Sequence, residues 1–96
     1  MVRYLSVINF TVQGIQGIHQ STARAHAFRS QVEKAGGRIL SQYWTVGDAD
    51  GFFVFEAPDD QIAMKLLIQL ERHGNVRTKS LRAFDEVEFA QISSQA

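Results

Sequence analysis

The sequence predicts a single α+β domain whose elements follow the order β-α-β-β-α-β. Four segments are rich in β-branched and aromatic residues, and in two others apolar residues recur at helical spacing before a closing glycine. The two middle strands flank a turn rich in glycine and aspartate at 47–51. This order is that of the ferredoxin-like plait, which places the first and third strands in the centre of the sheet and both helices on one face.

The first half of the chain supplies a strand, a helix and a second strand. The segment Tyr4–Thr11 predicts the first strand, and the glycines within 13–17 end it. Ser21 or Thr22 is a suitable N-cap for the helix, because a hydroxyl oxygen can accept from the first free backbone N–H groups. The inward residues of this helix are predicted to be Ala25, Phe28, Val32 and Ala35. Gly36-Gly37 ends it, and 38–45 is the second strand.

The second half supplies the remaining strands and a second long helix. The third strand is predicted at Phe52–Ala57, and the fourth at Asn75–Phe84. Pro58-Asp59-Asp60 begins the helix between them, because proline suits a first turn and acidic residues complement the helix dipole. Its inward residues are predicted to be Ala63, Leu66, Leu67 and Leu70. A short last helix is expected at 85–90, before a polar tail.

Length and composition indicate one globular domain that fills residues 1–96. Basic and acidic residues balance at ten each, so no net charge draws the chain toward nucleic acid or an anionic membrane. The absence of cysteine excludes disulfides, thiolate catalysis and cysteine-ligated metals. No apolar run approaches the roughly 18 residues of a membrane-spanning helix, and the first residues lack a signal-peptide layout. We therefore expect a cytoplasmic protein.

Both faces of the two central strands are predicted to be apolar. In the third strand, Phe53 and Phe55 alternate with Phe52 and Val54, and the first strand alternates in the same way. Two helices can cover only one of these faces, whichever set of residues points toward them. A soluble monomer rarely leaves a large apolar patch exposed. We therefore expect a homodimer or a higher homo-oligomer that pairs through the sheet.

Two stretches, Tyr43–Asp60 and Gly74–Phe84, resemble the GYD domain family. With the opening segment 4–15, the resemblance covers nearly the whole chain. The family loop usually reads Gly-x-Tyr-Asp, whereas here Ala49 stands in place of the tyrosine. The resemblance implies a ferredoxin-like fold of the dimeric α/β-barrel type that forms oligomers, without a settled activity.

The predicted function is that of an oligomeric module that binds a small apolar molecule or serves a structural role, without a cofactor. An aromatic-lined pocket between sheet and helices is the expected binding site. Such a pocket needs a few polar contacts, and the residues expected to supply them are Asn9, Thr11, Tyr43, Trp44 and Asp50.

The alternative is a cofactor-independent enzyme, similar to monooxygenases or isomerases that act on an aromatic or polyketide-like substrate. His19, in the loop before the first helix, is then the general base and Asp50 its acidic partner. His26 lies outside the apolar stripe, and His73 suits a helix end, where a cation is favoured. Asp48 and Asp50 fit a tight turn better than a calcium loop, because the other ligands of such a loop are missing, so no metal site is predicted.

A minor alternative is an RNA-binding module. The segment Gly51–Phe55 resembles a shortened form of the aromatic motif on the third strand of RNA-recognition domains. Asp50 stands where that motif needs a basic residue, and the net charge is zero, so the pattern argues against nucleic acid. Arg77 and Lys79 share one face of the fourth strand, and edge strands commonly carry such charges.

Overall fold

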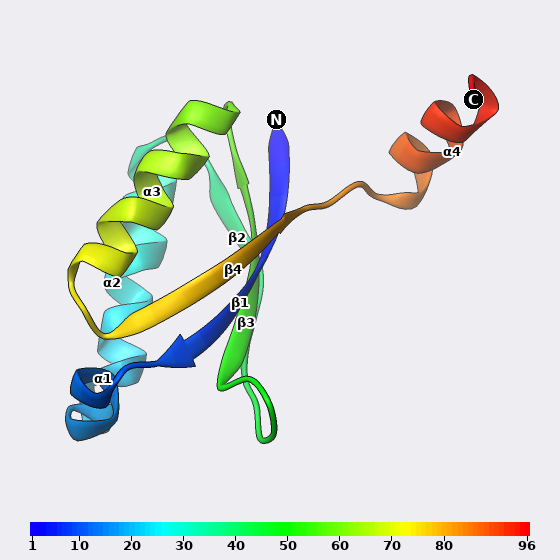
Figure 1. Ribbon diagram of the computed structural model, residues 1–96. Coiled ribbons are helices and arrows are strands. Elements are labelled where there is room, and N and C mark those ends of the chain that lie inside the picture. The colour runs from blue at the N-terminus through cyan, green and yellow to red at the C-terminus, as the bar shows by residue number, and fades with distance from the viewer.

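A four-stranded antiparallel sheet carries two long helices on one face (Figure 1). The computed structural model describes residues 1–96. The sheet order is β2-β3-β1-β4, so the first and third strands are central, as predicted. The strands are β1 (Val2–Phe10), β2 (Arg38–Trp44), β3 (Gly51–Ala57) and β4 (Val76–Arg82). The ferredoxin-like α+β fold is therefore confirmed.

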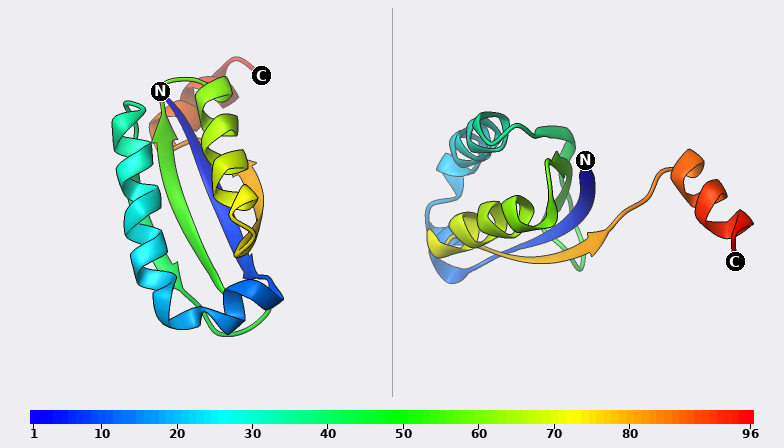
Figure 2. Two further views of the ribbon diagram at one scale, coloured as in Figure 1. Left: turned by 90° about the vertical axis from the view of Figure 1, so that its left-hand side faces the viewer. Right: turned by 90° about the horizontal axis from the view of Figure 1, so that it is seen from above.

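The helices α2 (Ser21–Lys34) and α3 (Asp60–Arg72) lie side by side over the sheet (Figure 2). Asp59 caps α3, because its side chain accepts from the backbone N–H of Ile62 at 2.8 Å. The N-cap of α2 is Gln20, which makes no side-chain cap, so the predicted cap at Ser21 or Thr22 is not the one that forms. No helix of the protein combines the length and apolar character needed to cross a lipid bilayer.

The segment that follows β1 is helical rather than a simple break. It forms α1 (Val12–Gln16) and a short 3-10 helix, Ile18–Gln20. Thr11 begins α1: its side-chain oxygen accepts from the N–H of Gly14, and its hydroxyl donates to the carbonyl of Gly74. This pair of bonds ties the end of β1 to the loop before β4.

The core lies between the helices and the sheet. Phe53 and Phe55 point toward the helices and are 1% and 0% exposed. Of the residues predicted to face inward on the two helices, five are buried: Phe28, Val32, Ala63, Leu66 and Leu67. Ala25, Ala35 and Leu70 are partly buried. Because side chains alternate along a strand, Phe52 and Val54 lie on the opposite face of β3.

That opposite face, called the open face below, is apolar at its centre and carries no helix of this chain there (Figure 2), whereas its outer positions include Arg3, Glu56, Arg77 and Lys79. Leu5 lies opposite Val54 on β3 and opposite Leu81 on β4, which makes an apolar row across three strands. Val7 and Phe52 form the next pair, and Tyr43 stacks on Phe52 with ring centroids 5.4 Å apart. The side chains of Leu81 and Tyr43 are mostly exposed.

The last helix, α4 (Glu86–Ser94), projects away from the sheet on the side of the open face (Figures 1 and 2). It runs four residues beyond the predicted 85–90, and Asp85 and Glu88 form a reciprocal capping box at its start. Val87, Phe89 and Ile92 are 77%, 60% and 49% exposed. At roughly 100° per residue, Val87 points away from the other two, so α4 is apolar on two opposing sides.

A chain of ion pairs fixes the start of α4 against the open face. Glu56 pairs with Arg38 at 2.9 Å and with Arg3 at 2.7 Å. Arg3 also pairs with Glu88 at 2.8 Å. Hydrogen bonds from Arg38 and then Arg3 hold the pKa of Glu56 below its ordinary value of 4.5. The hydrogen bond from Arg3 likewise contributes to lowering the pKa of Glu88, after that from the backbone of Asp85.

Replacing Glu56 by glutamine is expected to destabilise the fold at neutral pH by about 1–2 kcal/mol, because the charged hydrogen bonds to both arginines weaken. The folded pKa of Glu56 lies below the unfolded one, so its stabilisation is present above pH 4.5 and is lost as the pH falls through the lowered folded value. Urea unfolding of the Glu56→Gln variant and of the unchanged protein at several pH values measures this. The difference in unfolding free energy should narrow below pH 4.5.

The matched control is Glu33→Gln, because Glu33 is exposed on α2 and belongs to none of the ion pairs. Its unfolding free energy should follow that of the unchanged protein at every pH. A Glu56→Gln difference that stayed constant with pH would show that the carboxylate charge does not stabilise the fold.

Candidate functional site

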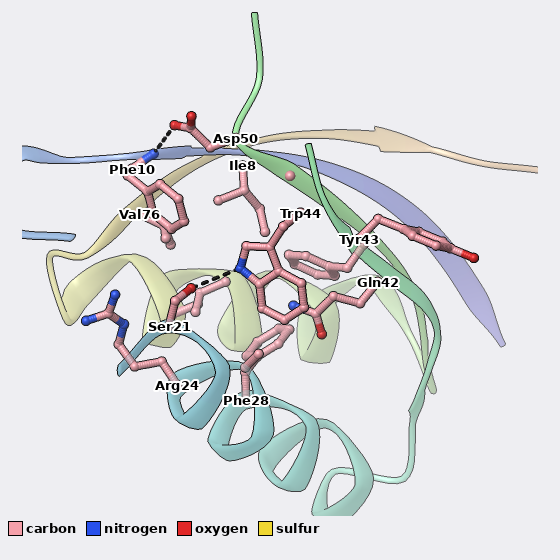
Figure 3. Close-up of a pocket in the computed structure, with 14 residues that line it drawn as sticks. Ile8, Phe10, Ser21, Arg24, Phe28, Gln42, Tyr43, Trp44, Asp50 and Val76 are labelled. Atoms are coloured by element: carbon pink, nitrogen blue, oxygen red, sulfur yellow. Dashed lines mark hydrogen bonds between the residues drawn. The ribbon is translucent and has the colours of Figure 1, made fainter. Parts of the chain in front are cut away.

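A small cleft opens between α2 and one end of the sheet (Figure 3). At this end β1 and β2 finish and β3 and β4 begin. The cleft holds about 50 Å³ and adjoins a second cavity of about 180 Å³ between α2 and α3. The two cavities share four lining residues: Arg24, Phe28, Leu70 and Val76.

The walls of the cleft are mainly apolar. Phe28 packs edge-on against Phe53 with ring centroids 5.1 Å apart, and both rings border the cleft. Ile8 and Phe10 line it from β1. Trp44 reaches across from β2 to α2, and its indole N–H donates to the hydroxyl of Ser21 at 3.0 Å (Figure 3). The cleft therefore offers aromatic and aliphatic surface with a hydrogen-bonded indole at one side.

Asp50 borders the cleft but serves the turn. Its carboxylate accepts from the backbone N–H of Phe10 at 2.8 Å, and its own backbone N–H donates to the carbonyl of Ile8 at 2.9 Å. Its carbonyl accepts from the N–H of Thr45 at 3.0 Å, which closes the loop between β2 and β3. In Figure 3 the carboxylate points toward Phe10 and away from the aromatic rings of the cleft. These bonds fit the prediction that Asp50 belongs to a tight turn.

Replacing Asp50 by alanine is expected to destabilise the fold by about 1–2 kcal/mol, because the partly buried N–H of Phe10 loses its acceptor. Asp48 provides a matched control, since it is exposed in the same loop and makes no side-chain hydrogen bond. Asp48→Ala should leave the unfolding free energy unchanged in urea titrations. Equal destabilisation by the two variants would mean that loop charge, rather than the bond to Phe10, is what stabilises this turn.

The structure brings together only part of the predicted site. Trp44 lines the cleft with its side chain, and Tyr43 borders it while its ring lies on the open face against Phe52. Asn9 also belongs to the open face, opposite Arg77 of β4. Thr11 caps α1 instead of lining the cleft.

His19 and Asp50 are not assembled as a catalytic pair. His19 is exposed in the 3-10 helix before α2, and it does not line the cleft that Asp50 borders. His26 is exposed on α2. His73, the C-cap of α3, lines the second cavity. The structure contains no group of three or more histidine, aspartate or glutamate side chains placed to hold a metal ion.

Among the polar cleft residues that the sequence did not predict, Ser21 and Arg24 both lie on α2. They extend the inward stripe of α2 by one turn, because Arg24 lies four residues before Phe28 and Ser21 three residues before Arg24. The sequence signal for these two residues is their position on the inward side of the helix, at the spacing of Phe28 and Val32. The inward side of a helix is identified by its apolar residues, so polar residues at the start of that side give no signal of their own.

The aromatic strand does not form the stacking platform of an RNA-recognition domain. Phe53 and Phe55 are buried in the core, so Phe52 is the only ring of β3 on the open face. The residues of β1 on that face are Arg3, Leu5, Val7 and Asn9, none of which is aromatic. Arg77 and Lys79 share the open face of the edge strand β4, as predicted.

Comparison with known proteins supports the same fold. The sequence model of the GYD domain matches residues 4–93, and that description names a domain and no reaction. No curated protein matches the chain.

Several solved structures share the fold at low sequence identity. MtbAldR is 12% identical with a TM-score of 0.60, over 88% of this chain and 52% of its own. The leucine response regulatory protein LrpA of Mycobacterium tuberculosis is 14% identical with a TM-score of 0.57, over 88% of this chain and 51% of its own. The chain thus spans about half the length of both. The protein TTHA0845 from Thermus thermophilus is 17% identical with a TM-score of 0.56, over 88% of this chain and 95% of its own.

Proposed function

Because this chain belongs to the GYD domain family, which matches it over residues 4–93, we propose that it is a small-molecule-binding module that pairs with a second copy of itself. The ligand site is the cleft between α2 and the sheet, and the pairing surface is the open face. The two surfaces lie on opposite sides of the sheet, so a second copy leaves the cleft accessible.

The observation that carries the ligand-binding proposal is the composition of the cleft. Binding sites for small molecules are concave, mostly apolar and supplied with a few polar groups that orient the ligand. Phe28, Phe53 and Trp44 give this cleft aromatic surface, and Ser21 and Arg24 stand at its edge. Because the cleft alone holds about 50 Å³, a molecule with a compact apolar part must also occupy the adjoining cavity of about 180 Å³.

The apolar row on the open face supports pairing with a second copy. Large exposed apolar patches mark interaction sites, and a second identical sheet offers a surface of the same shape and character. The projecting helix α4 adds to this argument. A copy seated on the open face lies beside α4 and can cover exposed apolar residues of this helix.

Fluorescence of Trp44 tests ligand binding directly, because it is the only tryptophan of the chain and lines the cleft. Titration with 2-phenylethanol, a neutral aromatic probe, should give a saturable change in the emission. Ala25→Leu places three extra carbons in the cleft and should abolish the change, whereas Ala23→Leu on the exposed side of α2 should leave it intact. No saturable change in the unchanged protein, or equal responses of the two variants, would contradict the proposal.

A further inference from the structure

Arg24 is the one basic residue common to the two adjoining cavities. It lies on the inward side of α2, one turn before Phe28, and is half-buried. Figure 3 shows its side chain on the flank of the cleft that faces Phe10 and Val76, away from Trp44. Arg24 therefore stands where the two cavities meet, and its guanidinium lies beside α1, bonded to the carbonyl of Gly14.

No carboxylate neutralises Arg24. None of the ion pairs of the structure includes it, and its guanidinium makes a single long hydrogen bond of 3.3 Å to the carbonyl of Gly14. A guanidinium has five N–H donors in a fixed planar arrangement, so most of them remain without a partner in the protein. Asp50 is the only acidic residue that lines either cavity, and its carboxylate bonds to Phe10 at the far rim.

The second cavity presents a further hydrogen-bond donor beside Arg24. Asn75 lines it, and its side-chain oxygen already accepts from the amide of Gln13 at 3.0 Å. Because the side-chain oxygen of Asn75 takes part in this bond, its NH₂ group is the remaining polar group of the side chain, and it has no partner in the protein. A guanidinium and an amide donor on one cavity, with an aromatic wall on the other side, match a ligand that joins an anionic head to an apolar body.

We propose that the two cavities form one site for a small carboxylic acid with an aromatic or branched aliphatic tail. The carboxylate accepts from Arg24, with Asn75 as the second donor, and the tail lies against the apolar walls of the cleft. Planar carboxylates match the planar guanidinium with two parallel hydrogen bonds, which favours this class over a neutral amide or alcohol of the same shape. The inference rests on the proposed ligand-binding function and names the chemistry of its ligand.

The test compares phenylacetate with phenylacetamide, which has the same shape without the charge, by the emission of Trp44. We expect phenylacetate to bind the unchanged protein at least about tenfold more tightly, the effect of a charge-assisted hydrogen bond. Arg24→Gln should lose this preference and bind both probes alike. Arg29→Gln, which removes an exposed arginine from the same helix, should keep it. Arg24→Lys should keep part of it, because the charge remains while the paired geometry is lost.

The outcomes separate the two proposals. If both probes bind the unchanged protein equally, or if Arg24→Gln keeps the preference, the carboxylate inference is wrong and the ligand-binding function stands. If neither probe produces a saturable change, both proposals fail. Circular dichroism of each variant verifies that it is folded, and Arg24→Lys supplies the comparison if Arg24→Gln is not.

Discussion

Replacing Phe55 by alanine is expected to destabilise the fold by about 3–5 kcal/mol, the cost of truncating a fully buried aromatic ring. Its side chain is 0% exposed, and its ring lies 5.9 Å from Tyr4, 6.3 Å from Phe28 and 5.6 Å from Phe53, measured between centroids. The loss is a large part of the roughly 5–15 kcal/mol that stabilises a typical domain. Urea unfolding followed by circular dichroism measures it.

Phe52→Ala is the matched control, because the same residue type on the same strand faces the other way. Within a single chain, Phe52→Ala should lower the unfolding free energy much less than Phe55→Ala, since Phe52 is only half-buried and stacks on the exposed ring of Tyr43. If Phe52 lies in an interface between copies, its cost should also grow with protein concentration, whereas that of Phe55 should not. Equal costs at low concentration would show that the core is not on the side of β3 assigned above.

The second large effect is expected from a charge at the centre of the open face. Val54 lies between Leu5 of β1 and Ser41 of β2 on that face. Val54→Asp would bury an unpaired carboxylate if a second copy covers the face, and we expect dissociation to single chains with an affinity reduced by at least about a hundredfold. Light scattering over a range of concentrations measures the mass.

Two further variants separate this effect from a general loss of folding. Val54→Thr keeps the shape without the charge and should weaken pairing less. Gln61→Asp adds the same charge at an exposed position of α3, on the side of the sheet away from the open face, and should leave the mass unchanged. Dissociation caused by Gln61→Asp as well would place the pairing surface elsewhere or assign the effect to net charge.

The order of elements and the central strands could be predicted from the sequence, because helical and strand periodicities are local and the helix-ending glycines are present. Which face of β3 is the core could not, because both sets of residues are apolar. Contacts far apart in the sequence decide it: Phe28 and Val32 of α2 meet Phe53 and Phe55 in the core.

Contacts far apart in the sequence also decide which residues form the site, and strand β2 shows why. The pairing of β2 with β3 shifts register between Ile39 and Ser41. Ile39 therefore packs against the core while Tyr43 lies on the open face, although the two are four positions apart and would share one face of a regular strand. The register shift reverses the alternation and turns Trp44 into the cleft. No local sequence signal marks this irregularity, so the sequence alone could not decide which of Tyr43 and Trp44 turns its side chain into the cleft.

Two further polar residues, Asn9 and Thr11, do not line the cleft for a related reason. Asn9 shares its side of β1 with Leu5 and Val7, and the choice between sides follows from the core contacts of the whole sheet. Thr11 lies beyond β1, where its hydroxyl finds backbone partners in Gly14 and Gly74. A threonine just after a strand fits a pocket residue or a helix cap equally well, and here its side-chain oxygen accepts from the backbone N–H three residues later and caps α1.

The solution mass of the unchanged protein tests the central claim, that a second copy covers the open face of the sheet. Light scattering at two concentrations, with native mass spectrometry of the same sample, compares the mass with that of a single chain, 10.8 kDa. The account predicts a stable particle of at least twice this mass at both concentrations. A single-chain mass at both concentrations would contradict it and would leave the apolar open face without a partner.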